Sequence, residues 1–297
     1  MKTLSMNLTK LTVFLAAFTF VIVLYSCQKE SSQVATETAV TEEAAATYSD
    51  ESTQTEASFD DVEDVSMTAA EEEVGSPTGR GIPTFDELRL RIGSCATITV
   101  SPNDSTYPKT VTIDFGSGCV CADGKFRSGA VIVFLTGPIR RPGSVMTITL
   151  RDFYLNRKHI EGTKTVSNLS ENSNIKFTVE VVGGKVTFPS GRGYTYNGLK
   201  YVKQIEGGQT RIVRDDVYSI ETRSKTEFNN GITVNLNTES PLIKKVACPW
   251  ISDGLLKIKI NSRILFLNYG APNNGDCDDK ALLTWDNGNK HRLITLP

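Results

Sequence analysis

Histidine is scarce in this chain, which has only His159 and His291 among its 297 residues. Neither histidine stands at a recognisable spacing from a nucleophile or a carboxylate, and the sequence holds no GxSxG, HExxH, SxxK or Walker motif. His159 lies in NRKHIEG beside an expected turn, where a solvated imidazole is the ordinary outcome. The sequence therefore gives no support to the motif-defined hydrolases, and we expect no cofactor and no resident metal.

The N-terminus lacks the length of apolar sequence that a permanent membrane helix needs. Lys2 and Lys10 precede or border an apolar stretch over residues 11–24, and the polar run QKESSQ follows Cys27. This order of a basic, an apolar and a polar region predicts a signal peptide over residues 1–26. A plain secretory signal with a chance cysteine is the alternative.

The end of this segment, LYSC over residues 24–27, resembles a bacterial lipobox. The resemblance implies that Cys27 is acylated and becomes the first residue of a membrane-anchored protein, and the acyl chains would hold it stably in the bilayer. The residues SCQKE are similar to the start of lipoproteins in Bacteroidota-type Gram-negative bacteria. That similarity implies an outer-membrane lipoprotein of the cell envelope, with surface exposure favoured by Lys29 and Glu30, and a nucleic acid is not expected as a partner.

Residues 28–80 are poor in bases and aromatic residues. They hold 14 Asp and Glu against Lys29 and Arg80, a net charge of −12, whereas residues 81–297 carry +8. Their aromatic residues are Tyr48 and Phe59. Such a composition predicts that residues 27–80 form a lipidated, disordered tether that folding of the domain does not need. Two alternatives stay open, namely a helical patch over residues 60–73 and an acidic segment that folds back on the basic domain as an electrostatic pseudo-ligand.

The remaining sequence, residues 81–297, lacks any long amphipathic helix, and its alternating β-branched runs predict strands. We expect an all-β domain of antiparallel sheet, either an extended β-sandwich or a curled meander. One short helix is expected near residues 84–91, with Thr84 as its N-cap and Glu87 completing a capping box. The strand-like runs are ATITV (96–100), TVTIDF (110–115), GAVIVFL (129–135), SVMTITL (144–150), IKFTVEVV (175–182), KVTF (185–188), ITVNL (232–236), LLKIKI (255–260), ILFL (264–267), ALLTW (281–285) and RLIT (292–295).

Five cysteines follow the proposed lipidation site, so one must stay unpaired. Two similar units occur, each with a cysteine, a strand, a turn, a returning strand and a second cysteine. Because antiparallel strands return the chain to its starting point, we expect Cys248 to bond Cys277, and Cys95 to bond Cys119 or Cys121. A metal or redox role for the CxC pair is the alternative, but the second ligand cluster of a zinc site is missing.

The motif IDFGSGC (113–119), together with GDCD (275–278) and the terminal ITLP (294–297), resembles uncharacterised lipoproteins of the same bacterial group. The similarity covers about residues 95–297. It implies a fold unit of unknown function and no activity, and it brings no catalytic residues to this chain.

The segment SGRGYTYNGLKYVK (190–203) interleaves bases and tyrosines. Such residues on an exposed sheet can stack on sugars and attract anions, so the segment predicts a ligand face for an anionic glycan. A cross-strand tyrosine ladder on an ordinary sheet is the alternative. The candidate residues are Arg192, Tyr194, Tyr196, Lys200, Tyr201 and Lys203.

Asn274, Asp276 and Asp278 alternate with Gly275 and Cys277 and resemble the first half of a calcium loop. Trp285 stands where the last carboxylate ligand of such a loop is expected. A turn rich in Asn, Asp and Gly needs no ion, so calcium remains the weaker interpretation.

The leading functional hypothesis is a non-enzymatic binding or structural module of the cell envelope. An adhesion module for a partner protein is one alternative. The other is a glycan-acting hydrolase that uses two strand carboxylates. Whether two of these carboxylates converge is open, as are the ligand, the face of the membrane and the oligomeric state. The candidate carboxylates are Asp114, Asp152, Glu180, Glu206 and Glu221.

Overall fold

The computed structural model describes residues 40–74, 85–172, 174–209, 213–271 and 273–296, which belong to one compact unit. The predicted signal peptide, the lipidation site Cys27 and the first part of the predicted tether lie outside the described residues. No helix in the described ranges combines the length and the apolar character needed to cross a membrane.

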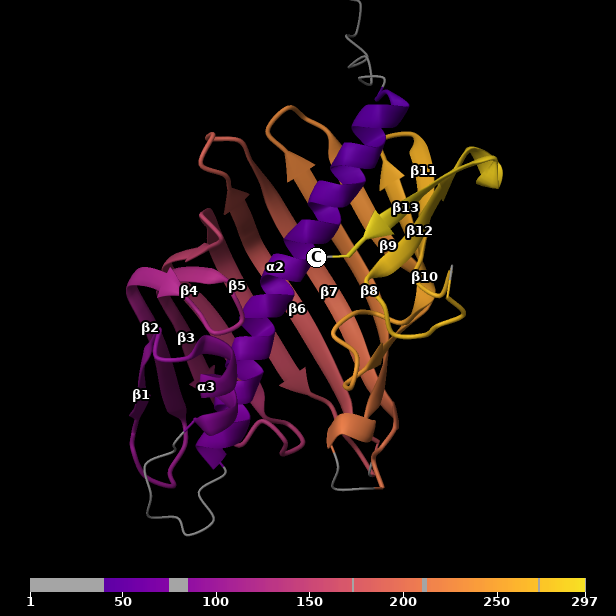
Figure 1. Cartoon of the computed structure of the whole chain (residues 1–297). Helices are drawn as coiled ribbons and strands as arrows, with labels where there is room; N and C mark the ends of the chain where they lie inside the picture. The colour runs from indigo at the N-terminus through magenta and orange to yellow at the C-terminus, as the bar shows by residue number, and fades with distance from the viewer. Residues whose placement is uncertain (1–39, 75–84, 173, 210–212, 272, 297) are drawn as a thin grey trace, which may run out of the picture. The chain divides into compact units, whose positions relative to one another are not determined.

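Thirteen strands form a single antiparallel sheet in which each strand pairs with its neighbours in sequence (Figure 1). The predicted all-β fold is confirmed, and it takes the form of a meander and not of a two-sheet sandwich. Two short 3-10 turns, η1 (Val213–Asp215) and η2 (Asp286–Gly288), lie in the connections. The strands are β1 (Thr97–Ser101), β2 (Lys109–Val120), β3 (Phe126–Leu135), β4 (Val145–Leu155), β5 (Lys158–Asn168), β6 (Lys176–Thr187), β7 (Gly193–Glu206), β8 (Val217–Phe228), β9 (Thr233–Lys245), β10 (Asp253–Ile260), β11 (Arg263–Asn268), β12 (Lys280–Trp285) and β13 (Lys290–Thr295).

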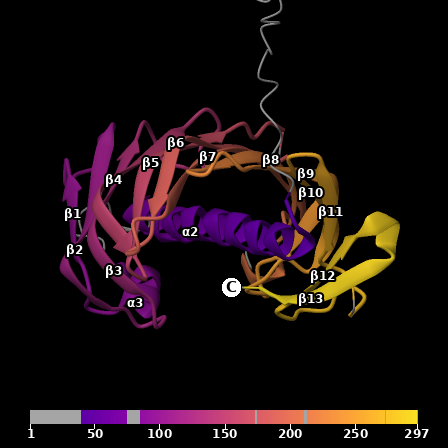
Figure 2. The same ribbon diagram turned by 90° about the horizontal axis from the view of Figure 1, so that it is seen from above.

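The sheet curves, so that one face is concave and the other convex (Figure 2). Alternation along the strands places apolar side chains such as Ile113, Ile148 and Ile258 on the concave face, where they are fully buried. Register shifts interrupt several strand pairs, as bulges do where a sheet must bend. One shift lies at Gly129, whose φ is 77° and whose added Cβ would lie 2.0 Å from the Asp152 carbonyl oxygen. Only glycine fits this position.

A helix of 33 residues, α2 (Glu42–Val74), lies along the concave face of the sheet (Figures 1 and 2). Phe59, Val62 and Val65 are buried against the sheet, within the same core cluster as the strand residues. The prediction of a disordered tether is therefore wrong over residues 42–74. The open alternative, an acidic segment that folds back on the basic domain, describes this part of the chain.

The short helix α3 (Asp86–Ile92) lies where the sequence predicted one. Thr84, the expected N-cap, lies outside the described residues, and the capping box is replaced by a contact from α2. The Glu72 carboxylate accepts hydrogen bonds from the backbone N–H groups of Glu87 at 2.7 Å and Leu88 at 2.9 Å. A carboxylate is favourable at a helix N-terminus because it satisfies free N–H groups and faces the positive end of the helix dipole.

Both expected cysteine pairs lie at disulfide distance, each closing a hairpin. Cys95 and Cys119 flank the β1–β2 hairpin with their Cα atoms 5.8 Å apart, and Cys248 and Cys277 flank β10–β11 at 5.6 Å. The structure thus settles the partner of Cys95 as Cys119. Cys121 is the free cysteine of the described ranges.

Candidate functional site

The most conspicuous polar feature is the match in charge between α2 and the sheet around it. The helix carries 12 carboxylates and no lysine or arginine. Its acidic residues meet bases of the sheet and its connections from one end to the other, so charge complementarity adds to apolar packing. The pairs include Glu42 with Lys290, Glu43 with Arg292, Glu51 with Arg192, Asp60 with Lys200, Asp61 with Arg127, Glu63 with Lys164, Asp64 with Arg91 and Glu71 with Arg140.

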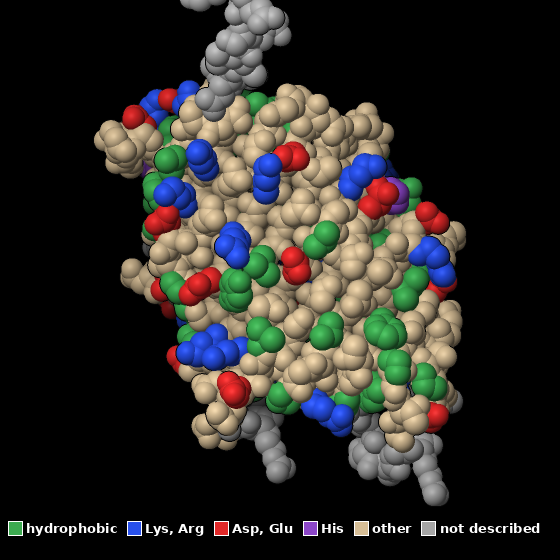
Figure 3. Space-filling view, turned by 180° about the vertical axis from the view of Figure 1, so that it is seen from behind, with side chains coloured by type: hydrophobic (Ala, Val, Ile, Leu, Met, Phe, Trp, Pro, Cys, Tyr) green, Lys and Arg blue, Asp and Glu red, His purple; other side chains and the backbone are tan. Residues whose placement is uncertain are grey.

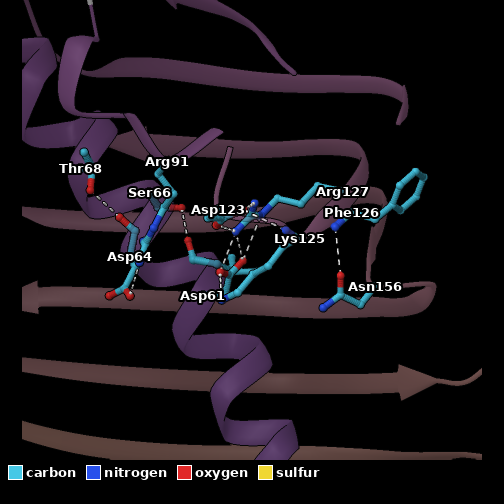
Figure 4. Close-up of polar contacts among 11 residues, drawn as sticks. Asp61, Asp64, Ser66, Thr68, Arg91, Asp123, Lys125, Phe126, Arg127 and Asn156 are labelled. Carbon is cyan, nitrogen blue, oxygen red and sulfur yellow. Dashed lines mark hydrogen bonds and ion pairs between the residues drawn. The ribbon is translucent and has the colours of Figure 1, made fainter. Parts of the chain in front are cut away.

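The most deeply buried pair joins Asp61 of α2 to Arg127 of β3 (Figure 4). Both side chains are 1% exposed, and the guanidinium binds Asp61 through Nε at 3.1 Å and Nη2 at 2.7 Å. Asp123 accepts from the same guanidinium at 2.7 Å, and Lys125 adds an ammonium to Asp61 at 2.7 Å. Burial alone would lower the pKa of Arg127, but the hydrogen bonds that its guanidinium donates to the two carboxylates outweigh burial and raise that pKa. The guanidinium is therefore a fixed charge.

A second cluster uses neighbouring residues of the same part of α2 and lies around Lys164 of β5, which is 3% exposed. Its ammonium contacts Glu63 at 2.5 Å and Asp60 at 3.5 Å, and donates to the Phe59 carbonyl at 2.9 Å. Lys200 of β7 binds the same Asp60 at 2.6 Å. Burial opposes the charge on Lys200, but the Asp60 carboxylate outweighs it and the lysine pKa is raised. Both lysines therefore form ion pairs with carboxylates of α2.

The predicted ligand face is divided by the pleat of β7. Tyr194 and Tyr196 point to the concave side and are each 1% exposed. The Tyr196 hydroxyl donates to Glu56 at 3.0 Å, and its ring stacks on Phe59 with centroids 5.0 Å apart. Burial raises the pKa of Tyr194 to about 12. These tyrosines belong to the packing between helix and sheet.

Four of the six predicted ligand residues therefore contact α2. Arg192 and Lys200 pair with its carboxylates, although the Arg192 side chain remains 47% exposed. Tyr201 and Lys203 lie on the opposite, convex face, where Tyr201 is 47% exposed. The prediction of one shared ligand face is wrong. Residues of alternate parity on a strand point to opposite sides of a sheet.

The predicted calcium loop is a set of turns between β11 and β12. Asn274 has a positive φ of 56°, a conformation that asparagine tolerates well. The Asp278 carboxylate accepts from the backbone N–H of Lys280 at 2.8 Å, and Gly275 is buried beside Ser252. One of the three oxygen donors expected for a cation, the Asp278 carboxylate, thus serves the backbone of the turn.

The strand carboxylates do not gather around one cleft in the described residues. Asp114 is held by Arg151 at 2.9 Å, and Asp152 lies at a bulge with a φ of 46°. Glu180 alone among the five candidates lines a hollow. Glu206 and Glu221 are exposed on β7 and β8. No pair with the arrangement of a glycosidase follows from this geometry.

A hollow of about 390 Å³ lies on the convex face between β6 and β9. β6 shifts register beside this hollow, between Val181 and Gly184. Strand pairing sets the residues of the hollow in two rows, with Asn197, Lys225 and Asn235 in one and the apolar Leu199 with Arg223 and Asn237 in the next. Figure 3 shows this face, on which charges of both signs are scattered without forming a patch of one sign.

Sequence reasoning missed this hollow because its residues come from four strands and are spread over about 60 positions. A signal was nevertheless present, since ITVNLN (232–237) alternates apolar residues with asparagines, which places Asn235 and Asn237 on one face.

Comparison with known proteins gives no relative. No protein-family model, no curated protein and no solved structure matches the chain.

Proposed function

We propose that the chain is a membrane-anchored lipoprotein of the cell envelope whose β unit is a non-enzymatic module that binds a glycan through its convex face. The observation that carries this proposal is the filling of the concave face by α2. The helix occupies the groove in which a curved sheet would otherwise hold a ligand, and its carboxylates neutralise the bases there. The convex face is the broad sheet surface left for a partner.

The chemistry of the convex hollow suits a polar ligand with hydroxyl and acidic groups. The side chains of Asn235, Asn237 and Arg223 line the hollow, where Arg223 and Asn237 are exposed and Asn235 is half-buried. Planar amide and guanidinium groups bind hydroxyls and carboxylates well, and Arg binds a carboxylate in bidentate fashion. Tyr201 lies two residues from Leu199 on the same face of β7 and offers a ring for stacking.

Binding to a uronic-acid polysaccharide tests the ligand proposal. We expect Arg223→Ala and Asn237→Ala each to weaken binding, with Arg223→Ala costing about tenfold or more, because charge-assisted hydrogen bonds contribute about 1.5–3 kcal/mol. Binding should also weaken with added salt, since salt screens the attraction between exposed charges, with a Debye length of about 10 Å at 0.1 M. Isothermal titration calorimetry measures both effects.

The matched control for this titration is Lys176→Ala, which removes an exposed base from the same face of β6, four residues from Glu180 and outside the residues that line the hollow. It should retain near wild-type affinity. Equal losses in all three variants would show nonspecific attraction and contradict the site. Turnover of the polysaccharide that Glu180→Gln abolishes would replace the proposal with the hydrolase.

Lipid anchoring is tested separately at Cys27. The variant Cys27→Ala cannot accept a diacylglycerol thioether, so we expect the protein to move from the membrane fraction to the soluble fraction of cells. Immunoblotting of fractionated cells measures the distribution. The control Cys121→Ser removes a cysteine that is buried in the folded unit and should stay with the membrane. Full membrane retention of Cys27→Ala would contradict the anchor.

A further inference from the structure

Three cysteine sulfurs gather at one end of the sheet, beside α3. Cys95 follows α3, Cys119 belongs to β2, and Cys121 follows directly after β2. Their Sγ atoms all lie within 4.8 Å of one another. Cys95 and Cys119 form the disulfide, and Cys121 is the free thiol, 5% exposed. The free thiol of Cys121 thus lies within 4.8 Å of both sulfurs of the disulfide.

We propose that this cluster is a thiol–disulfide exchange site in which the bond to Cys95 passes between Cys119 and Cys121. Cys121 loses its proton to solvent, and the thiolate electron pair forms a bond with Cys95 Sγ. The Cys95–Cys119 bond breaks, and its electron pair leaves on Cys119 Sγ, which takes up a proton. One disulfide and one thiol exist before and after, so the step needs no oxidant or reductant.

The direction of attack follows from the chain. Bonding Cys121 to Cys119 would close a very small ring across Val120, whereas Cys95 approaches both cysteines from the adjacent segment before β1. Only exchange at Cys95 therefore keeps a disulfide between the segment before β1 and the end of β2. Its two products close nearly the same loop, of 24 residues in one case and 26 in the other, so chain entropy hardly distinguishes them.

The surroundings of Cys121 set the rate of this step. Burial raises the pKa of the Cys121 thiol, and the carboxylates of Asp123 and Asp61 act in the same direction, while the Arg127 guanidinium acts against them. The thiol is therefore mostly protonated near neutral pH. Because the thiolate is the nucleophile, exchange should be slow at pH 7 and quicken about tenfold for each pH unit below the thiol pKa.

Exchange changes what the protein presents to its surroundings. In the observed pairing the thiol is buried at Cys121, whereas Cys119 and Cys95 are only partly buried. Moving the bond to Cys121 leaves the thiol on Cys119, where a small disulfide or a dithiol partner can reach it. The cluster thus converts a protected thiol into one that can form a mixed disulfide.

Trapping of the free thiol in the mature wild-type protein tests the proposal. Samples are held with a metal chelator at pH 7 and pH 9 and quenched in acid. The free thiol is then labelled with a maleimide under denaturing conditions, and the remaining cysteines are reduced and labelled with iodoacetamide. Tandem mass spectrometry of peptides spanning residues 110–125 locates the maleimide.

We expect the share of maleimide at Cys119 to grow with time and to grow faster at pH 9. Label confined to Cys121 at both pH values would overturn the proposal, and label at Cys248 or Cys277 would show general scrambling and overturn it as well.

A second measurement uses Cys119→Ser, with Cys121→Ser as the matched control. If exchange occurs, Cys95 bonds Cys121 in Cys119→Ser and bonds Cys119 in Cys121→Ser, so neither variant has a free thiol after residue 94. Thiol titration and non-reducing peptide mapping measure this. Two free thiols at Cys95 and Cys121 in a Cys119→Ser protein with the wild-type circular dichroism spectrum would overturn the proposal. The wild-type trapping result stands independently of whether either variant folds.

Discussion

A chain that begins at residue 81 is expected not to fold. It lacks α2, whose buried residues Phe59, Val62 and Val65 complete the core on the concave face of the sheet. Each large side chain lost from a core costs about 2–5 kcal/mol, and the total stability of a domain is only about 5–15 kcal/mol. We therefore expect residues 81–297 to aggregate or to show no cooperative thermal transition by circular dichroism, whereas residues 28–297 unfold cooperatively. The same midpoint for both chains would contradict the role assigned to α2.

Rescue with a separate helix distinguishes missing packing from a general defect of the shortened chain. Refolding residues 81–297 with a synthetic peptide of residues 40–74 should restore a cooperative transition, because the helix contacts the sheet through side chains and ion pairs. A peptide of the same composition in scrambled order keeps the charge of −12 and loses the buried stripe. Equal rescue by both peptides would show that charge alone holds the helix.

The β architecture could be predicted from sequence because strand alternation is a local property. Runs such as LLKIKI and TVTIDF show period-two apolar residues, and they became β10 and part of β2. The cysteine pairs followed from the return of antiparallel hairpins, as for Cys248 and Cys277. Both inferences depend on residues within about 30 positions of each other.

The helix α2 was missed because the first half of its buried stripe consists of small and hydroxyl side chains, and large apolar residues begin only at Phe59. Ala45, Ser49, Ser52 and Thr55 face the sheet at spacings of three and four residues. Two of the hydroxyls are satisfied locally: Ser49 donates to the Ala45 carbonyl at 3.0 Å, and Thr55 donates to that of Glu51 at 2.8 Å. The Ser52 hydroxyl instead pairs with that of Thr226 on β8 at 3.0 Å. Ser and Thr that bond back to the preceding turn can be buried at small cost, and small side chains allow close approach to the sheet. Hydropathy does not register such a stripe.

The signal that could have found α2 lay in charge and spacing together. Residues 28–80 carry a net charge of −12 and precede residues 81–297, which carry +8. The small residues of the acidic segment recur with a helical period between its carboxylates. The ligand face was wrong for a simpler reason. Tyr194, Tyr196 and Lys200 share one parity on β7, whereas Tyr201 and Lys203 have the other. Strand pleating alone assigns the two sets to opposite faces.

The substitution Asp61→Asn is expected to lower the free energy of unfolding by about 3–5 kcal/mol. It removes the charge that pairs with Arg127 inside the protein, where both side chains are 1% exposed. Removing one partner of a buried ion pair leaves the other charge uncompensated, and Asp123 then carries the neutralisation alone. Urea denaturation at pH 7, followed by circular dichroism, measures the change.

Two further variants decide whether the buried charge is the cause. Asp64→Asn breaks a pair on the same helix, but the Asp64 side chain is 61% exposed and its 3.2 Å contact with Arg91 lies near solvent, so the cost should stay below about 1 kcal/mol. The double variant Asp61→Leu with Arg127→Met removes both buried charges and should recover much of the stability, since an apolar pair of similar volume can replace a buried ion pair. Asp123 would then lose its own partner, so recovery is expected to be incomplete. Equal losses for Asp61→Asn and Asp64→Asn would show that helix propensity, and not the buried pair with Arg127, accounts for the effect.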